Sequence, residues 1–252
     1  MNIANLIKEK INVYQVTEPI IVDELFNGLE NHKEAVYVTL NRLVGDGVIV
    51  HYNKGVYFKP KNTKFGKIGV DKKRLIEKKY LKRNNKVVGY ITGPLLWNDW
   101  GLTTQIPNRI WIAQDIKQKK IDEDLGVMLV KAKTAISEKN IKALQFLDVI
   151  DQIEYIQDAD KEEIIRKLIH IFREKLTIFD KVVVMEEVKN YTKKVKVLFG
   201  LIAEATVIDN EYFLATLNYL KEDVSIGKKT IININPLVFK NNRTWGNGFA
   251  SS

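Results

Sequence analysis

Few side chains in this sequence could perform acid–base, nucleophilic or metal chemistry. The 252 residues include three histidines, His32, His51 and His170, and no cysteine. A Ser-His-Asp triad would need a histidine as its base, but His170 lies in an amphipathic helical pattern, where we interpret it as a helix-face residue. The absence of cysteine excludes thiolate nucleophiles and Cys-type zinc sites, and it fits a reducing compartment. We therefore expect a cytoplasmic location.

Two acidic groupings are the remaining catalytic candidates. One is a cluster of four acids: Asp158, Asp160, Glu162 and Glu163. These acids begin a predicted helix, where they would stabilise the positive end of the helix dipole. The other is Glu187 with Lys189, a Glu-x-Lys pair of the kind found in restriction-type nucleases. A nuclease also needs an acid on an upstream strand, and nearby Asp180 is expected on the same helix or its cap. Because no Gly-rich phosphate loop is present either, we predict no enzymatic activity, no metal site and no cofactor.

Residues 90–109, YITGPLLWNDWGLTTQIPNR, form the most distinctive stretch. Gly93 and Pro94 can start a short helix, and Gly101 can end it in a left-handed cap. The polar side chains of residues 103–105 can satisfy backbone groups in the loop that follows. We interpret the block first as a folding signature and second as a binding surface. Catalysis ranks last because the block has one carboxylate and no general base of suitable pKa.

Helical spacing of apolar residues predicts three short helices in the first part of the chain. The first covers residues 2–12 and the second lies within residues 20–30. The third covers Lys33 to Asp46, with Asn31 and Glu34 at the spacing of a capping box.

The run VIVHYNKGVYFKP, residues 48–60, indicates two short strands joined by a turn at residues 53–55. Three short helices followed by such a hairpin are typical of a winged helix-turn-helix, whose third helix enters the major groove of DNA. Its predicted exposed face carries Asn41 and Arg42, which can bond bidentately to base edges. Further candidate DNA contacts flank this helix or the turn: His32, Lys33, Tyr37, Asn53 and Lys54.

Positive charge is concentrated in residues 61–86, which hold eleven Lys or Arg against two acids and so account for the whole net charge of +9. A local basic block indicates a polyanionic partner. We expect four of its side chains to contact phosphates: Lys72, Lys73, Arg74 and Lys78. Residues 1–60 carry six basic and seven acidic groups, which is a poor balance for neutralising phosphates. A second interpretation therefore stays open, in which the winged helix binds protein and the basic block binds RNA or an acidic partner.

The segments GVYFKP, TKFGKIG and GYITGPLLWNDWGLTTQIPNR together resemble the AbiEi family and a related uncharacterised bacterial family. AbiEi proteins are the antitoxins and autorepressors of type IV toxin–antitoxin (abortive infection) operons. The resemblance covers roughly residues 1–205, and the Gly-Leu-Thr-Thr-Gln run is its most specific part. The antitoxin-domain motif falls on Gly93, Gly101, Leu102, Thr103, Thr104, Gln105, Pro107, Asn108 and Arg109. The chain departs from the family pattern at Trp97 and Trp100, where the family usually has a small residue and another apolar residue.

This resemblance implies an autorepressor that binds inverted repeats of double-stranded DNA in its own promoter. It also implies an antitoxin that neutralises a nucleotidyltransferase-type toxin without a stable complex. The apolar runs are shorter than the roughly 18 residues that suggest a membrane span, so no membrane partner is expected.

The expected architecture is α+β. A winged helix-turn-helix over residues 1–60 is followed by a basic linker over residues 61–70 and a larger mixed domain over residues 71–252. Within that domain, strands are predicted over residues 126–133 and 228–239. Helices are predicted over residues 139–156, 160–176, 181–190 and 193–205. Gly200 would allow close packing of the last of these helices.

Overall fold

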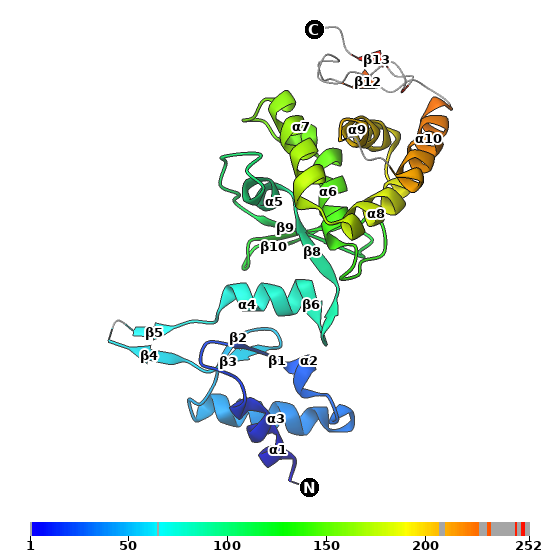
Figure 1. The fold of residues 1–252 in the computed structure, drawn as a ribbon. Coiled ribbons are helices and arrows are strands. Elements are labelled where there is room, and N and C mark those ends of the chain that lie inside the picture. The colour runs from blue at the N-terminus through cyan, green and yellow to red at the C-terminus, as the bar shows by residue number, and fades with distance from the viewer. Residues whose placement is uncertain are drawn as a thin grey trace. The chain divides into compact units, whose positions relative to one another are not determined.

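The computed structural model describes residues 2–64, 66–206 and 210–226, together with residues 231–232, 245 and 248–249. The chain mixes α-helices and β-strands, which confirms the predicted α+β class. It divides into two compact units, residues 1–86 and residues 87–252, which we call the N-terminal and C-terminal units (Figure 1). The division therefore lies after the whole basic segment and not at the linker predicted over residues 61–70.

The N-terminal unit begins with three helices, α1 (Ile3–Asn12), α2 (Val22–Leu25) and α3 (Lys33–Gly45). Asn2 caps α1, because its side chain accepts hydrogen bonds from two amides of the first turn. The capping box predicted for α3 does not form. A 3-10 turn at Glu30–His32 leads into this helix, and its start carries no side-chain cap among the described residues. Glu30 instead accepts the amide of Gly28 at 2.9 Å.

A three-stranded antiparallel sheet completes this core, with the order β1-β3-β2. The strands are β1 (Pro19–Ile21), β2 (Val50–Asn53) and β3 (Val56–Phe58). The β2–β3 hairpin turns at Lys54 and Gly55, and Gly55 has a φ of 74°, which glycine adopts without strain. Helices and sheet share one hydrophobic core: Ile7, Ile11, Ile20, Val22, Leu25, Leu29, Val36, Leu40, Leu43, Ile49 and Tyr57.

The basic segment is folded and belongs to the same unit. It comprises a hairpin of β4 (Lys61–Thr63) and β5 (Gly66–Ile68), helix α4 (Lys72–Ile76), a π-helical turn (Glu77–Leu81) and a second hairpin of β6 (Lys82–Arg83) and β7 (Lys86–Val87). Asp71 caps α4 by accepting the amide of Arg74 at 3.1 Å. Leu75, Ile76 and Tyr80 are buried, so this segment has an apolar side that an extended linker would lack.

The C-terminal unit begins with a four-stranded sheet of order β10-β11-β9-β8. The strands are β8 (Gly89–Thr92), β9 (Ile110–Gln114), β10 (Lys120–Asp122) and β11 (Val127–Lys131). β9 and β11 are parallel, and the other pairings are antiparallel. The predicted strand over residues 126–133 corresponds to β11. The short helix α5 (Pro94–Asp99) lies in the connection from β8 to β9.

Five longer helices follow: α6 (Ile141–Asp151), α7 (Lys161–His170), α8 (Ile178–Glu187), α9 (Lys193–Glu204) and α10 (Glu211–Ser225). The first four match the predicted helices with shifted ends. α8 starts earlier than predicted because Thr177 and Asp180 form a capping box. α10 was not predicted. The strand predicted over residues 228–239 lies outside the described residues except for β12 (Ile231–Ile232), which pairs with β13 (Gly248–Phe249).

Aromatic side chains join these helices into one core. Phe172, in the π-helical turn after α7 (Ile171–Lys175), lies 5.4 Å from Phe146 of α6 and 5.6 Å from Phe199 of α9, measured between ring centroids. The predicted close packing at Gly200 is confirmed, since a Cβ there would overlap the buried indole of Trp245. The indole nitrogen of Trp245 also donates to Glu204 at 3.0 Å.

Candidate nucleic-acid interface

The exposed face of α3 carries the predicted base-reading side chains. Val36, Leu40 and Leu43 are buried, so Asn41 and Arg42 lie on the solvent side of the helix. His32 and Lys33 are exposed at its start, and Tyr37 is exposed one turn further along. The ring of Phe26 orients two of these residues. It lies edge-on to Tyr37 at 5.8 Å and beneath the Lys33 ammonium at 5.4 Å.

The β2–β3 turn holds the other predicted contacts. Lys54 is exposed at its tip, whereas Asn53 is half-buried and takes part in contacts within the chain. His51 lies against Tyr57 in a tilted arrangement, with ring centroids 4.9 Å apart. Burial raises the pKa of the Tyr57 hydroxyl above its ordinary value, so Tyr57 supports the turn as a neutral side chain.

A hollow of about 390 Å³ brings parts of this interface together. Tyr37 from α3 and Lys54 from the turn both line it. Lys79 and Arg83 of the basic segment line it too, although neither was predicted as a contact. The sequence showed only that both residues belong to the basic block. Nothing in their spacing distinguished them from its other nine cations.

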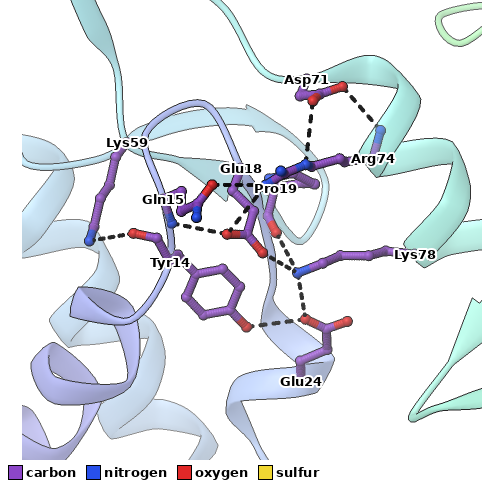
Figure 2. A network of polar contacts seen from close by, with 9 residues as sticks. All are labelled: Tyr14, Gln15, Glu18, Pro19, Glu24, Lys59, Asp71, Arg74 and Lys78. Atoms are coloured by element: carbon purple, nitrogen blue, oxygen red, sulfur yellow. Dashed lines mark hydrogen bonds and ion pairs between the residues drawn. The ribbon is translucent and has the colours of Figure 1, made fainter.

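Two of the predicted phosphate contacts, Arg74 and Lys78, have acidic partners within the unit. Figure 2 shows Arg74 and Lys78 reaching back to Glu18, just before β1, and Lys78 also reaching Glu24 in α2, an arrangement that we call the anchor. The Lys78 ammonium lies 3.2 Å from Glu18 and 3.4 Å from Glu24, and it donates to the carbonyl of Pro19 at 3.1 Å. Arg74 lies 3.8 Å from Glu18. Both cations therefore have acidic partners within the unit, and their contact with phosphates stays a prediction.

The anchor is partly withdrawn from water. Burial raises the pKa of the Glu18 carboxyl, but the Gln15 amide, Lys78 and Arg74 outweigh it and hold that pKa below its ordinary value. Tyr14 lies under the Lys78 ammonium at 4.6 Å and donates its hydroxyl to Glu24 at 3.1 Å. Burial first, and the Glu24 charge second, raise the pKa of Tyr14. The anchor therefore combines a carboxyl of lowered pKa, Glu18, with a neutral phenol, Tyr14, around one ammonium.

The remaining cations of the basic segment are exposed, except for the half-buried Lys79. Five of their side chains form no hydrogen bond or ion pair within the described part of the chain: those of Lys61, Lys64, Lys67, Lys73 and Lys86. Lys72 is exposed on α4 and takes part in a contact of its own. The free positive charge thus lies mainly on the β4–β5 hairpin and the outer side of α4.

In the C-terminal unit, the distinctive block forms the helix that its glycines and proline predicted. Gly93 precedes α5 with a φ of 69°, Pro94 occupies the first turn, and Gly101 follows the helix with a φ of 67°. A Cβ at Gly93 would lie 2.5 Å from the ring of Trp111. Position 93 therefore requires glycine for space as well as for conformation. Leu102, directly after Gly101, is buried.

The polar residues of the block hold the loop that leaves α5. Asp158 accepts the Thr103 hydroxyl at 2.5 Å and both the amide and hydroxyl of Thr104 at 3.1 Å. The Thr103 hydrogen bond is the largest cause of the lowered pKa of Asp158. Asn98 donates to the carbonyls of Thr103 and Gln105 at 3.4 Å and 3.2 Å. These side chains stabilise a loop conformation.

The last residues of the block lead into β9. Pro107 is half-buried and Asn108 is exposed. Arg109 forms two short contacts with the carboxylate of Glu123, at 2.9 Å and 2.8 Å. Arg109 is thus engaged within the unit.

A buried carboxylate that the sequence did not reveal lies beneath β8. Asp148 of α6 accepts the hydroxyls of Tyr90 at 2.9 Å, Thr92 at 3.0 Å and Tyr191 at 2.9 Å. Burial raises its pKa to about 6, and the three hydroxyl donors oppose that rise. Its signal in the sequence is an isolated acid in the apolar run ALQFLDVI. The site is closed to solvent, since all four side chains are buried.

The catalytic candidates do not converge. Glu187 accepts the side-chain amide of Asn140 at 2.8 Å, while the Lys189 ammonium lies over the ring of Tyr219 at 5.5 Å. His170 is exposed at the end of α7. Within the described residues, no three His, Asp or Glu side chains are grouped so that they could hold a metal ion.

None of the described helices combines the length and apolar character that crossing a membrane requires. No family model, curated protein or solved structure significantly matches this chain.

Proposed function

We propose that this protein is a DNA-binding transcriptional autorepressor that also acts as the antitoxin of a type IV toxin–antitoxin system. The observation that best supports DNA binding is the exposed polar face of α3, whose Tyr37 shares a hollow with Lys54 of the β2–β3 turn. The order helix, strand, helix, helix, strand, strand in residues 3–58 supports a winged helix-turn-helix. In that architecture α3 is the recognition helix and the β2–β3 hairpin is the wing.

The chemistry of α3 suggests how the groove would be read. Arg42 can donate two hydrogen bonds to guanine, and Asn41 can pair with adenine. Val38 lies on the same face and is 58% exposed, and an apolar side chain there can contact the methyl group of thymine. The exposed cations Lys33, Lys54 and Lys73 would contact phosphates, which position the protein without selecting a sequence.

The antitoxin part of the proposal rests on the resemblance of residues 93–109 to the AbiEi family. The C-terminal unit would counter a nucleotidyltransferase-type toxin without a stable complex. The protein would bind inverted repeats in its own promoter, act in the cytoplasm, and have no catalytic activity of its own.

A second candidate function is a non-catalytic module that binds protein or RNA. The charge balance of residues 1–60 favours it, since this segment has seven acidic and only six basic side chains. The anchor favours it too, because it neutralises Arg74 and Lys78, two of the cations that a DNA-binding surface would use. This candidate predicts weak DNA binding without sequence preference.

Fluorescence anisotropy of the full-length protein on DNA separates the two functions. A labelled duplex from the region upstream of its gene would be titrated beside a scrambled duplex, across a salt series. We expect the upstream duplex to bind at least about a thousandfold more tightly, the lower range for specific binders. Equal and steeply salt-dependent affinities would instead support the second function.

Two substitutions test the docking arrangement in the same assay. Arg42→Ala should weaken binding to the upstream duplex by roughly tenfold or more, because it removes a base contact worth about 1–3 kcal/mol. Lys54→Ala should weaken binding to both duplexes alike and reduce the salt dependence of the affinity. Lys139→Ala, an exposed change in the C-terminal unit, serves as the control. Unchanged affinities for both variants would rule out this docking arrangement.

A further inference from the structure

A pocket of about 390 Å³ opens on the C-terminal unit, between α5, the start of α6 and the π-helical turn after α7. That volume falls within the range of small-molecule sites, about 300–1,000 Å³. Trp100, Ile171 and Leu176 form its apolar lining. Trp100 itself rests on Phe146 of the core, with ring centroids 6.5 Å apart. The indole is therefore a supported wall of the pocket.

The polar lining consists of Asp99, Lys142, Gln145 and Lys175. Asp99 and Lys175 have no hydrogen bond or ion pair within the described part of the chain. Lys142 has one long contact, 3.9 Å from Asp180. Gln145 uses its amide nitrogen on the carbonyl of Ile91 at 2.9 Å, which leaves its carbonyl oxygen free to accept. Several polar groups with open hydrogen-bonding capacity thus surround one aromatic wall.

The two tryptophans of the distinctive block differ in how deeply they are buried. Trp97 is 5% exposed and packs edge-on against Trp111 at 6.0 Å, so it belongs to the core. Trp100 is half-buried and lines the pocket, and, like that of Trp97, its indole N–H has no acceptor among the described residues. A core role accounts for Trp97 and leaves the pocket-facing position of Trp100 unexplained.

We propose that this pocket binds a nucleotide, with the base against Trp100 and the phosphate between Lys142 and Lys175. Planar bases stack on aromatic side chains whatever their sequence. Lysine ammonium groups bind phosphate as point charges. The free acceptors of Asp99 and Gln145 suit exocyclic amino or sugar hydroxyl donors. Inorganic phosphate alone would leave the indole uncovered, and a purely apolar ligand would leave two ammonium groups and a carboxylate unpaired.

The inference does not depend on DNA binding by the N-terminal unit. The same chemistry could come from a free mononucleotide or from the phosphorylated end of a strand. The probes are therefore AMP, adenosine, inorganic phosphate and a 5′-phosphorylated tetranucleotide. Each would be titrated into the full-length, nitrogen-15-labelled protein.

The readout is the indole N–H signal of Trp100, assigned by its loss in Trp100→Phe. We expect AMP to shift this signal at concentrations where adenosine and inorganic phosphate have much smaller effects, while the buried Trp97 signal stays in place. Tighter binding of the tetranucleotide than of AMP would assign the site to a strand end, and the reverse would assign it to a free nucleotide.

Matched charge reversals locate the site. Lys142→Glu together with Lys175→Glu should weaken AMP binding at least about tenfold, because two charge-assisted contacts are replaced by repulsion. Lys139→Glu makes the same kind of change on an exposed lysine outside the pocket and should leave the affinity unchanged. Three outcomes would overturn the proposal: no movement of the Trp100 signal at millimolar AMP, an equal response to inorganic phosphate, or full binding by the double variant.

Discussion

The space beside Gly93 decides whether the residue before α5 can carry a side chain. Its backbone has a φ of 69° and a ψ of −149°, a region that is essentially restricted to glycine. The ring of Trp111 also occupies the position of a Cβ. Gly101, at the other end of α5, has a φ of 67° but open space around it. A side chain at Gly101 would therefore meet conformational strain alone, whereas one at Gly93 would meet both strain and steric overlap.

Gly93→Ala should destabilise the C-terminal unit by several kcal/mol, since strain of about 1–3 kcal/mol is joined by a clash with Trp111. Gly101→Ala should cost about 1–2 kcal/mol, because only the left-handed conformation opposes it. Urea denaturation of both variants measures the difference. Equal losses would show that Trp111 can move away at little cost.

Asp148 gives the C-terminal unit a characteristic pH dependence. Burial raises its pKa from 3.8 to about 6, so the folded state holds the proton more tightly than the unfolded chain does. This contribution is complete below about pH 4 and is lost as the pH rises through about 6, by an amount on the order of 3 kcal/mol. Asp148→Asn removes the titration.

The stability of the wild type relative to Asp148→Asn should therefore fall between pH 4 and pH 7. Urea denaturation at several pH values measures it, and other titrating groups cancel in the difference. A constant difference would mean that the carboxyl of Asp148 titrates normally.

At the scale of elements, the anchor connects the basic segment to the β1 and α2 regions of the same unit. One ammonium, that of Lys78, is shared by two carboxylates from β1 and α2 regions of the chain. Its side chain is 25% exposed, so the interaction lies between a surface ion pair and a buried one. Removing it leaves Glu18 with Arg74 as its remaining counter-charge and takes away the ion pair of Glu24.

Lys78→Met should destabilise the N-terminal unit by roughly 1–3 kcal/mol, between the values for exposed and buried ion pairs. Lys73→Met removes an exposed lysine of the neighbouring helix that lacks a partner among the described residues. It should change stability by less than about 0.5 kcal/mol. Thermal unfolding followed by circular dichroism compares the variants, and equal effects would exclude an anchoring role for Lys78.

Elements with local signals were predictable and long-range partners were not. The apolar period placed α3 within one residue of its observed ends, and the turn at Gly55 placed the β2–β3 hairpin. The anchor pairs Lys78 with an acid 54 residues away. The hydroxyls that donate to Asp148 belong to residues up to 58 positions away. No periodicity encodes such pairings, because they depend on how the elements meet. For the same reason, the sequence did not show that residues 61–86 belong with the N-terminal unit.

At the scale of the whole molecule, the excess of positive over negative charge lies in one part of the chain. Residues 61–86 carry the entire net charge of +9, and the free cations among them cluster on the β4–β5 hairpin and α4. A localised positive field attracts polyanions and makes their binding sensitive to salt. Binding of DNA and any role of the C-terminal unit should therefore respond to different substitutions.

Replacing Lys61, Lys64 and Lys67 with Gln should lower the slope of log K against log salt by up to about 3, since each phosphate contact contributes about 0.9. The preference for the upstream duplex over the scrambled one should stay the same, because these lysines would contact phosphates and not bases. Anisotropy across a salt series measures both quantities. An unchanged slope would place the β4–β5 hairpin away from bound DNA.

The hydroxyls around Asp148 also bear on the order of events during folding. Tyr90 and Tyr191 lie 58 residues before and 43 residues after this carboxylate. Contacts that close such long loops form late, because the entropy of closure must be overcome first. Removing the Tyr191 hydroxyl with Tyr191→Phe should therefore accelerate unfolding and leave the refolding rate nearly unchanged. The three hydroxyl contacts would then determine how long the C-terminal unit stays folded and have little influence on how fast it forms.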